Sequence, residues 1–378
     1  MQTIRRNNHY PILLIALIIL LLPGDSQAVG YDFSGQLSGW TIESRSEDDW
    51  DNNFGLRYIP RLILEQPLND DSFFDTEVSF NGFLAANSGK SSENSDLKLY
   101  RLKLRFATTQ TETRIGLQKI NFGPALLLRP LRWFDRLDLR DPLQLTEGVY
   151  GLRFKYNALN NANFWFWCLY GNDDTKGYET LQTSSGKPEF GGRLQYPVPY
   201  GELAATFHTR NVDASLSNGI DFTENRFALD GKWDIGIGLW FEGAVFKQNS
   251  SWLPYPWQQM LTLGIDYTFG IGNGLNAVGE HFIFGQSSEF LSSGERLEFS
   301  AVSLNYPLGL LDSLSGIVYY DWENRDFYRF INWQRTYDRW QIYVMGFWNP
   351  EEFLIYQTNT ESSLFTGTGF QIMVVYNY

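Results

Sequence analysis

The run Tyr100-Arg101-Leu102-Lys103-Leu104-Arg105-Phe106 alternates large apolar side chains with charged ones. Successive side chains of a β-strand point to opposite faces, so this run predicts a strand with one apolar face and one charged face. The same alternation recurs at residues 226–233 and at residues 369–378. This pattern predicts an all-β fold.

A strand of this kind fits a soluble sandwich or a barrel with lipid outside and water inside. Rows of Arg, Lys and Asp on the polar face, and Trp or Tyr at the ends of the apolar face, favour the barrel. We expect a transmembrane antiparallel β-barrel of about 18 strands, with 16 as the alternative. The candidate strands are residues 32–44, 54–66, 73–86, 97–108, 113–120, 149–157, 162–171, 188–196, 201–210, 223–233, 236–247, 258–269, 275–285, 295–306, 312–322, 326–336, 339–348 and 366–378.

The predicted connections alternate in length. Long, Ser- and Asn-rich loops such as residues 171–187 and 348–366 alternate with short turns such as residues 196–201 and 270–274. This order is expected of a bacterial barrel whose termini both lie in the periplasm.

Residues 1–28 have the form of a secretory leader. A basic start (Arg5, Arg6) precedes the apolar run 12–22, and a Pro23-Gly24 break precedes Ser26-Gln27-Ala28. The apolar run is shorter than the roughly 20 residues of a membrane-spanning helix, so an uncleaved anchor is the weaker alternative. We expect cleavage after Ala28 and a single domain at residues 29–378, with 28 basic and 42 acidic residues.

The composition excludes several kinds of site. One Cys and three His are too few for a disulfide framework or a structural zinc site, and we expect no cofactor and no metal. A net charge of −13 argues against nucleic-acid binding, which needs a basic face. In the mature chain only His208 and His281 are ordinary general bases, and neither has a Ser two positions later. We interpret both as wall residues and expect no enzymatic activity.

The longest predicted connection, residues 121–148 after the fifth strand, differs from the other loops. It has an apolar part, with Leu126-Leu127-Leu128 and Trp133-Phe134, and a part rich in Arg and Asp. We expect it to fold into the lumen, with its apolar side chains on the wall and its charged side chains in water, and to narrow the pore. The alternative is an amphipathic outer helix or lid with no role in transport.

Basic charge is concentrated around this loop. Residues 97–155 carry 12 basic and five acidic side chains, whereas the rest of the mature chain carries 16 basic and 37 acidic. We expect the basic wall and the loop to orient solutes and select charge at the narrowest point. For each Arg, a local ion pair that only holds the loop to the wall is the alternative. The candidate pore-lining residues are Arg101, Lys103, Arg105, Arg114 and Arg153 on the wall and Arg129, Arg132, Asp135, Arg136, Asp138 and Arg140 in the loop.

Two motifs resemble a known family. The run Arg114-Ile115-Gly116-Leu117-Gln118-Lys119-Ile120-Asn121-Phe122-Gly123-Pro124, followed by Arg129-Pro130-Leu131, Phe134-Asp135 and Asp141-Pro142, resembles the constriction-loop region of Gram-negative outer-membrane porins. It is most similar to the phosphate-selective and alginate-export-like barrels, although Leu117 stands where those families often have Arg. The terminal Val374, Tyr376 and Tyr378 resemble the signal that the barrel-assembly machinery reads.

This resemblance implies a porin of the cell outer membrane that passes small polar or anionic solutes by diffusion. The implied partners are outer-membrane lipid, the barrel-assembly machinery during biogenesis and a small-molecule solute, and a homotrimer is compatible with the resemblance. Two alternatives belong to other classes. One is an outer-membrane enzyme or adhesin on the same barrel, and the other is an exported soluble β-protein whose Trp side chains stack on sugars.

Overall fold

The computed structural model describes residues 29–46, 49–87, 93–135, 141–215, 219–292, 294–350 and 365–378. The predicted leader and three candidate residues, Arg136, Asp138 and Arg140, lie outside these ranges. Among the described residues, no helix has the length and apolar character needed to cross a membrane.

The described residues form eighteen antiparallel strands in one sheet. The strands are β1 (Gly30–Ser46), β2 (Asp49–Asn69), β3 (Ser72–Asn87), β4 (Glu93–Thr108), β5 (Thr111–Gln118), β6 (Val149–Asn157), β7 (Asn163–Leu169), β8 (Glu189–Val198), β9 (Gly201–Val212), β10 (Phe222–Asp234), β11 (Gly238–Gln248), β12 (Trp257–Phe269), β13 (Leu275–Ser287), β14 (Glu295–Pro307), β15 (Asp312–Asp321), β16 (Asp326–Thr336), β17 (Trp340–Trp348) and β18 (Thr368–Asn377). Each predicted strand overlaps one of them, so the prediction of an 18-stranded barrel is confirmed.

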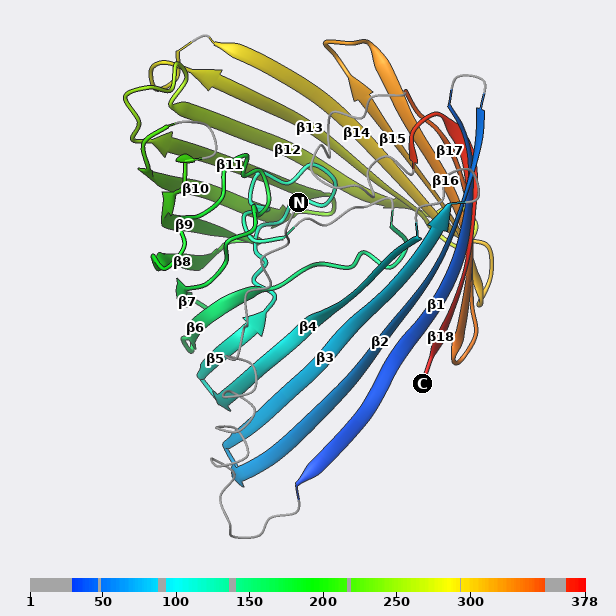
Figure 1. Ribbon diagram of the computed structural model, residues 1–378, viewed down its shortest axis with the longest axis horizontal. Helices are drawn as coiled ribbons and strands as arrows, with labels where there is room; N and C mark the ends of the chain where they lie inside the picture. The colour runs from blue at the N-terminus through cyan, green and yellow to red at the C-terminus, as the bar shows by residue number, and fades with distance from the viewer. Residues whose placement is uncertain are drawn as a thin grey trace.

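The sheet closes on itself because β18 pairs with β1 as well as with β17. Figure 1 shows the first strand, in blue, beside the last, in red. The register runs from Gln36 opposite Asn377 to Arg45 opposite Thr368. Closure pairs the edges of the sheet, which would otherwise be sites of aggregation.

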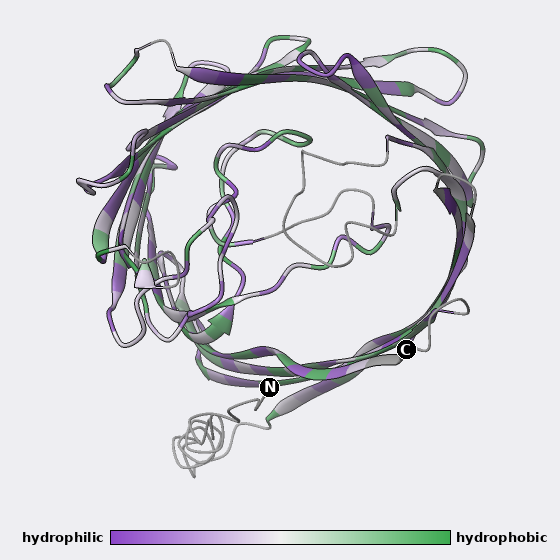
Figure 2. Cartoon of the chain, turned by 45° about the horizontal axis from the view of Figure 1, so that its top comes forward, coloured by the Kyte–Doolittle hydropathy of each residue, from purple (hydrophilic) through white to green (hydrophobic). Residues whose placement is uncertain are grey.

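Strand β10 illustrates how alternation separates the two faces of the wall. Its outward residues Phe227 and Leu229 are 54% and 61% exposed, whereas its inward residues Arg226 and Asp230 are only 1% and 3% exposed. Figure 2 shows the resulting mixture of hydrophilic and hydrophobic residues along the strands. An apolar outer face with polar groups inside is the arrangement of a barrel in lipid.

The two ends of the barrel differ. At one end short turns join neighbouring strands, as between Val198 of β8 and Gly201 of β9. At the other end the connections after β5, β7 and β17 are long. The described residues begin at Val29 and end at Tyr378 towards the short-turn end, where Tyr378 Oη donates a hydrogen bond of 2.8 Å to Tyr58 Oη. The predicted alternation of long loops and short turns is therefore observed in part, because the connections from β1 to β2 and from β15 to β16 at the long-loop end have the length of turns.

Candidate functional site

The segment that follows β5 enters the barrel and contacts the wall on its far side. Figure 2 shows chain segments inside the ring of strands. Glu280 of β13 accepts two hydrogen bonds at Oε1, from the backbone N–H of Leu126 (2.7 Å) and from Trp240 Nε1 (2.9 Å). Its Oε2 accepts two more, from the N–H groups of Leu127 (2.9 Å) and Leu128 (2.6 Å). One wall carboxylate therefore satisfies three consecutive backbone donors of the segment.

A second wall carboxylate, Glu242 of β11, holds both ends of the same turn. It accepts hydrogen bonds from the N–H groups of Ala125 (2.7 Å) and Leu131 (3.1 Å). Gly123 has a φ of 92°, and a side chain at this position would overlap the Glu242 carboxylate. Glycine is therefore required here for both backbone conformation and space.

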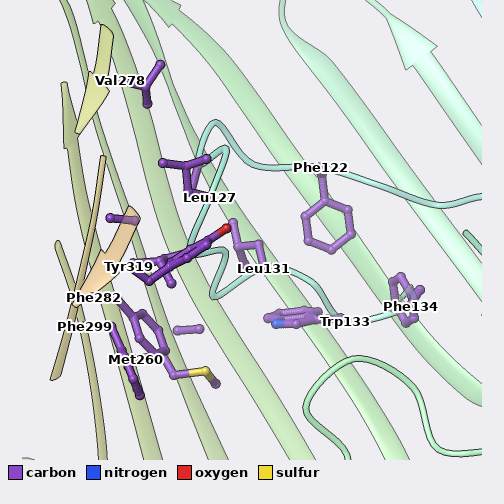
Figure 3. Close-up of a cluster of buried hydrophobic side chains, with 14 of the residues drawn as sticks. Phe122, Leu127, Leu131, Trp133, Phe134, Met260, Val278, Phe282, Phe299 and Tyr319 are labelled. Carbon is purple, nitrogen blue, oxygen red and sulfur yellow. The ribbon is translucent and has the colours of Figure 1, made fainter. Parts of the chain in front are cut away.

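The apolar side chains of the segment pack against an apolar part of the inner wall (Figure 3). Trp133 is 1% exposed, and its ring makes edge contacts with Phe122 (5.5 Å between ring centroids) and with Phe246 of β11 (5.9 Å). The expected packing of Leu127, Leu128, Trp133 and Phe134 is observed. Leu126 differs from the expectation, because its side chain is 45% exposed while its N–H faces Glu280.

A second segment, residues 170–188 after β7, also packs on the inner wall through buried ion pairs. Lys176 lies 3.1 Å from Glu189 of β8, and Glu179 lies 2.6 Å from Arg226 of β10 and 3.3 Å from Arg210 of β9. The side chains of all five residues are at most 7% exposed. The sequence pattern predicts an ordinary outer loop here, and the structure corrects that prediction.

The two segments contact each other. The Arg132 guanidinium lies 5.0 Å from the centre of the Tyr178 ring, a cation–π contact. Gly177 has a φ of 50°, and a side chain there would overlap the Arg132 carbonyl oxygen. Phe134 of the first segment makes an edge contact with the buried ring of His208 on β9, with 5.0 Å between the ring centroids. The two segments therefore form one layer on the inner wall.

Removing the Glu179 carboxylate should detach the second segment. The variant Glu179→Ala leaves Arg210 and Arg226 buried with one carboxylate fewer, which costs about 3 kcal/mol and raises the detached population roughly 100-fold. We expect trypsin to cleave after Lys176 much faster in this variant than in the wild type, while the barrel stays intact. The control is Asp174→Ala, an exposed carboxylate on the same segment. Equal cleavage in Glu179→Ala and in the control would contradict the anchoring role.

Three predicted wall arginines lie side by side on neighbouring strands. Arg105 of β4 is opposite Arg114 of β5, and Arg114 is opposite Arg153 of β6. Like charges in register repel, so they need counter-charges. Glu112 supplies one: it bonds Arg114 at 2.7 Å, lies 3.5 Å from Arg105 and also bonds Arg153. Asp75 of β3 pairs with Arg105. Three cations thus share two carboxylates, and the group keeps an excess positive charge.

Solvent access divides the predicted wall residues into two sets. The side chains of Arg105, Arg114 and Lys103 are 29%, 22% and 18% exposed, so they reach the water of the lumen. Arg153 is 7% exposed, and Arg101 is buried, with a 2.8 Å hydrogen bond to the carbonyl oxygen of Thr146. The first set can act on a solute, whereas the second set supports the wall.

The predicted loop residues are placed differently from the expectation that they face water. Arg129 is buried and bonds Asn121 and the carbonyl oxygen of Phe122, within its own segment. Arg132 is buried against Tyr178. Asp135 is buried, and neither of its carboxylate oxygens has a hydrogen-bond partner in the part of the chain that the structure describes. Asp141, which follows in the same connection, lies 3.9 Å from Arg57 of β2.

Sequence reasoning missed the residues that hold the first segment, Glu242 and Glu280. Each is a single acidic residue on an inward position of a strand whose other inward positions are mostly apolar, as with Trp240 and Phe282. A lone carboxylate among apolar side chains must find donors or be neutralised. A lone acidic residue among apolar inward positions is therefore the sequence signal that identifies Glu242 and Glu280 as anchors.

No protein-family model matches this sequence, and no curated protein is similar to it. Solved structures do match its fold. OccAB1 of Acinetobacter baumannii has a TM-score of 0.55 and 10% identity, over 92% of this chain and 95% of that one. The anion-selective porin from Comamonas acidovorans has a TM-score of 0.53 and 10% identity, over 93% and 100% of the two chains.

This chain has the fold of the Gram-negative outer-membrane porins. A trimer form of OmpT, an outer membrane protein of Vibrio cholerae, has the same fold, with a TM-score of 0.52 and 14% identity over 93% of this chain and 100% of that one. At these identities the likeness concerns the fold alone.

Proposed function

We propose that this protein is a porin of the Gram-negative outer membrane that passes small polar or anionic solutes by diffusion. The observation that carries the proposal is the partly solvent-exposed row of Lys103, Arg105 and Arg114 on the inner wall. Cations on a water-filled wall raise the local concentration of anions and lower the barrier to their entry. No step of this function requires a cofactor or a catalytic group.

The segment after β5 acts in this proposal as the constriction. It occupies lumen space next to the far wall and is held there by Glu242 and Glu280. A fixed segment of this kind narrows the pore and brings solutes closer to the basic wall. Selection of solutes by their charge then comes from the wall residues, because Arg129 and Arg132 of the segment are buried.

The finer assignments belong to the same proposal. The run 114–124 supports an anion porin similar to the phosphate-selective and alginate-export-like barrels, whereas Leu117, which stands where those families often have Arg, argues against their solute. Residues 1–28 would be removed on export, and the barrel-assembly machinery would insert the chain through its C-terminal signal. We also propose a homotrimer, which the trimer form of the Vibrio cholerae protein supports by its fold. Chemical cross-linking of the folded protein tests the trimer.

Liposome swelling tests the proposed function. Liposomes that contain the folded mature protein are diluted into iso-osmotic solutions of an anionic, a neutral and a cationic solute of similar size. We expect swelling in all polar solutes and the fastest swelling with the anion. Swelling no faster than in protein-free liposomes, or fastest with the cation, would contradict the proposal.

A further inference from the structure

The outer wall of β13 and β14 carries a polar group of side chains. His281 lies opposite Ser300, and both point outward because their neighbours Glu280 and Phe299 point into the barrel. The next outward residue of β14, Val302, is 49% exposed and apolar. Charged side chains on a lipid-facing surface cost up to about 2–4 kcal/mol each at mid-depth, so such a group calls for an explanation.

The hydrogen bonds of this group run in one order, from Trp322 to Ser300 and from Ser300 to His281. Trp322 Nε1 donates to Ser300 Oγ (2.9 Å), and an indole can only donate. The Ser300 hydroxyl is therefore free to donate to His281 Nδ1, 3.0 Å away. The proton on the other ring nitrogen, Nε2, then faces Glu298, whose Oε2 is 3.7 Å distant. The three residues stand in the order of a nucleophile, a base and a carboxylate, with the carboxylate at ion-pair distance from the base rather than at hydrogen-bond distance.

Glu298 is itself held in place. Arg296 Nε lies 2.7 Å from Glu298 Oε1, which leaves Oε2 for the histidine. The imidazole of His281 is 38% exposed and the Glu298 side chain 33% exposed, so a substrate on the outer surface can reach them.

We propose that Ser300, His281 and Glu298 form a hydrolase site that cleaves acyl esters of membrane lipids. The position of the group across the thickness of the membrane fits this substrate. Trp322 follows the last residue of β15 at the long-loop end, and Trp side chains favour the membrane interface. Outward residues further along β14 are apolar, so the group lies at the boundary between headgroups and acyl chains, where lipid esters lie. The site is separate from the proposed pore, because it lies on the opposite face of the wall.

An apolar hollow of about 1460 Å³ adjoins the group on the outside of the barrel. It is lined by outward apolar residues such as Phe227 of β10, Leu261 of β12 and Ile283 of β13, and it extends to Arg296. Ile283 is the outward residue next to His281 on the same strand, and Arg296 bonds Glu298, so the hollow begins beside the polar group. An acyl chain in this hollow would bring its ester to Ser300.

The reaction balances with water as the only co-reactant. Ser300 Oγ attacks the ester carbonyl carbon while His281 Nδ1 takes its proton, and Glu298 stabilises the imidazolium. The C–O bond to the alcohol breaks, and the alcohol leaves with the proton from His281. Water, activated by His281, then cleaves the acyl-serine to a fatty acid and restores Ser300.

The test uses the folded mature protein with phosphatidylethanolamine vesicles and, separately, with lipopolysaccharide micelles. Released fatty acid is measured by mass spectrometry. We expect release from at least one lipid, and a loss of at least about 100-fold in Ser300→Ala and His281→Ala. The control is Ser303→Ala, on the same strand but at an inward position, and it should release fatty acid like the wild type. The lipid that is cleaved identifies the source of the ester.

Single-channel conductance of the same samples reports the fold and the pore, and it should be equal in Ser300→Ala and the wild type. Wild-type protein that conducts but releases no fatty acid from either lipid would overturn the site and leave the porin proposal standing. Release that persists in Ser300→Ala would also overturn it. Release without conductance would support the hydrolase site and contradict the porin.

Discussion

The variant Glu280→Gln should release the inward segment from the far wall and open a larger pore. The glutamine has one acceptor oxygen where the carboxylate has two, so about two of the four donors (Leu126, Leu127 and Leu128 N–H, and Trp240 Nε1) lose their acceptor. Each buried donor left unpaired costs about 1–3 kcal/mol, so docking should weaken by about 3 kcal/mol. We expect the single-channel current to rise at least about twofold, with frequent transitions between levels.

The matched control for this variant is Glu289→Gln, which makes the same chemical change at an exposed position between β13 and β14. Its conductance should equal that of the wild type. Heat-modifiable migration on gels reports that both barrels fold. If Glu280→Gln folds but has the same current and as few transitions between levels as the control, the segment is not held by this carboxylate or does not limit the pore.

The double variant Arg105→Glu with Arg114→Glu should reverse the charge preference of the pore. In the wild type, Arg105, Arg114 and Arg153 share Asp75 and Glu112. The variant changes this group from three cations and two carboxylates to one cation and four carboxylates. Since Arg105 and Arg114 reach solvent, we expect the sign of the reversal potential in a KCl gradient to change.

The control for the charge reversal is Arg325→Glu with Arg339→Glu, two exposed residues in turns outside the strands. It changes the net charge equally and should leave the reversal potential near its wild-type value. If the two double variants behave alike, the wall arginines only pair with their neighbouring carboxylates and do not select ions.

The strands could be predicted from the sequence because their signal is local. Alternation in runs such as residues 100–106 depends only on which residues are adjacent, and burial on one face of the wall enforces it. The inward fold of the segment after β5 was also predictable in part, since apolar side chains such as Trp133 and Phe134 need to be buried. These features require no knowledge of which strands meet across the lumen.

The partners of the inward segment could not be predicted, because they are distant in the sequence. Glu280 is more than 150 residues from Leu126, and only the curvature of the closed barrel brings them together. The same reason explains Ser300 beside His281: neither histidine has a serine two positions along the chain, and strand pairing supplies one from β14. Arg129 differs, because its hydrogen-bond partners are Asn121 and the carbonyl oxygen of Phe122 in its own segment rather than water or solute.

The measurement that tests the central claim most directly is the single-channel current of the folded mature protein in a planar bilayer, with the reversal potential under a KCl gradient. The account predicts discrete conductance steps and a reversal potential of the sign expected for anion preference, because Lys103, Arg105 and Arg114 line the water-filled side of the wall. A properly folded barrel that inserts but never conducts, or that prefers cations, would contradict it.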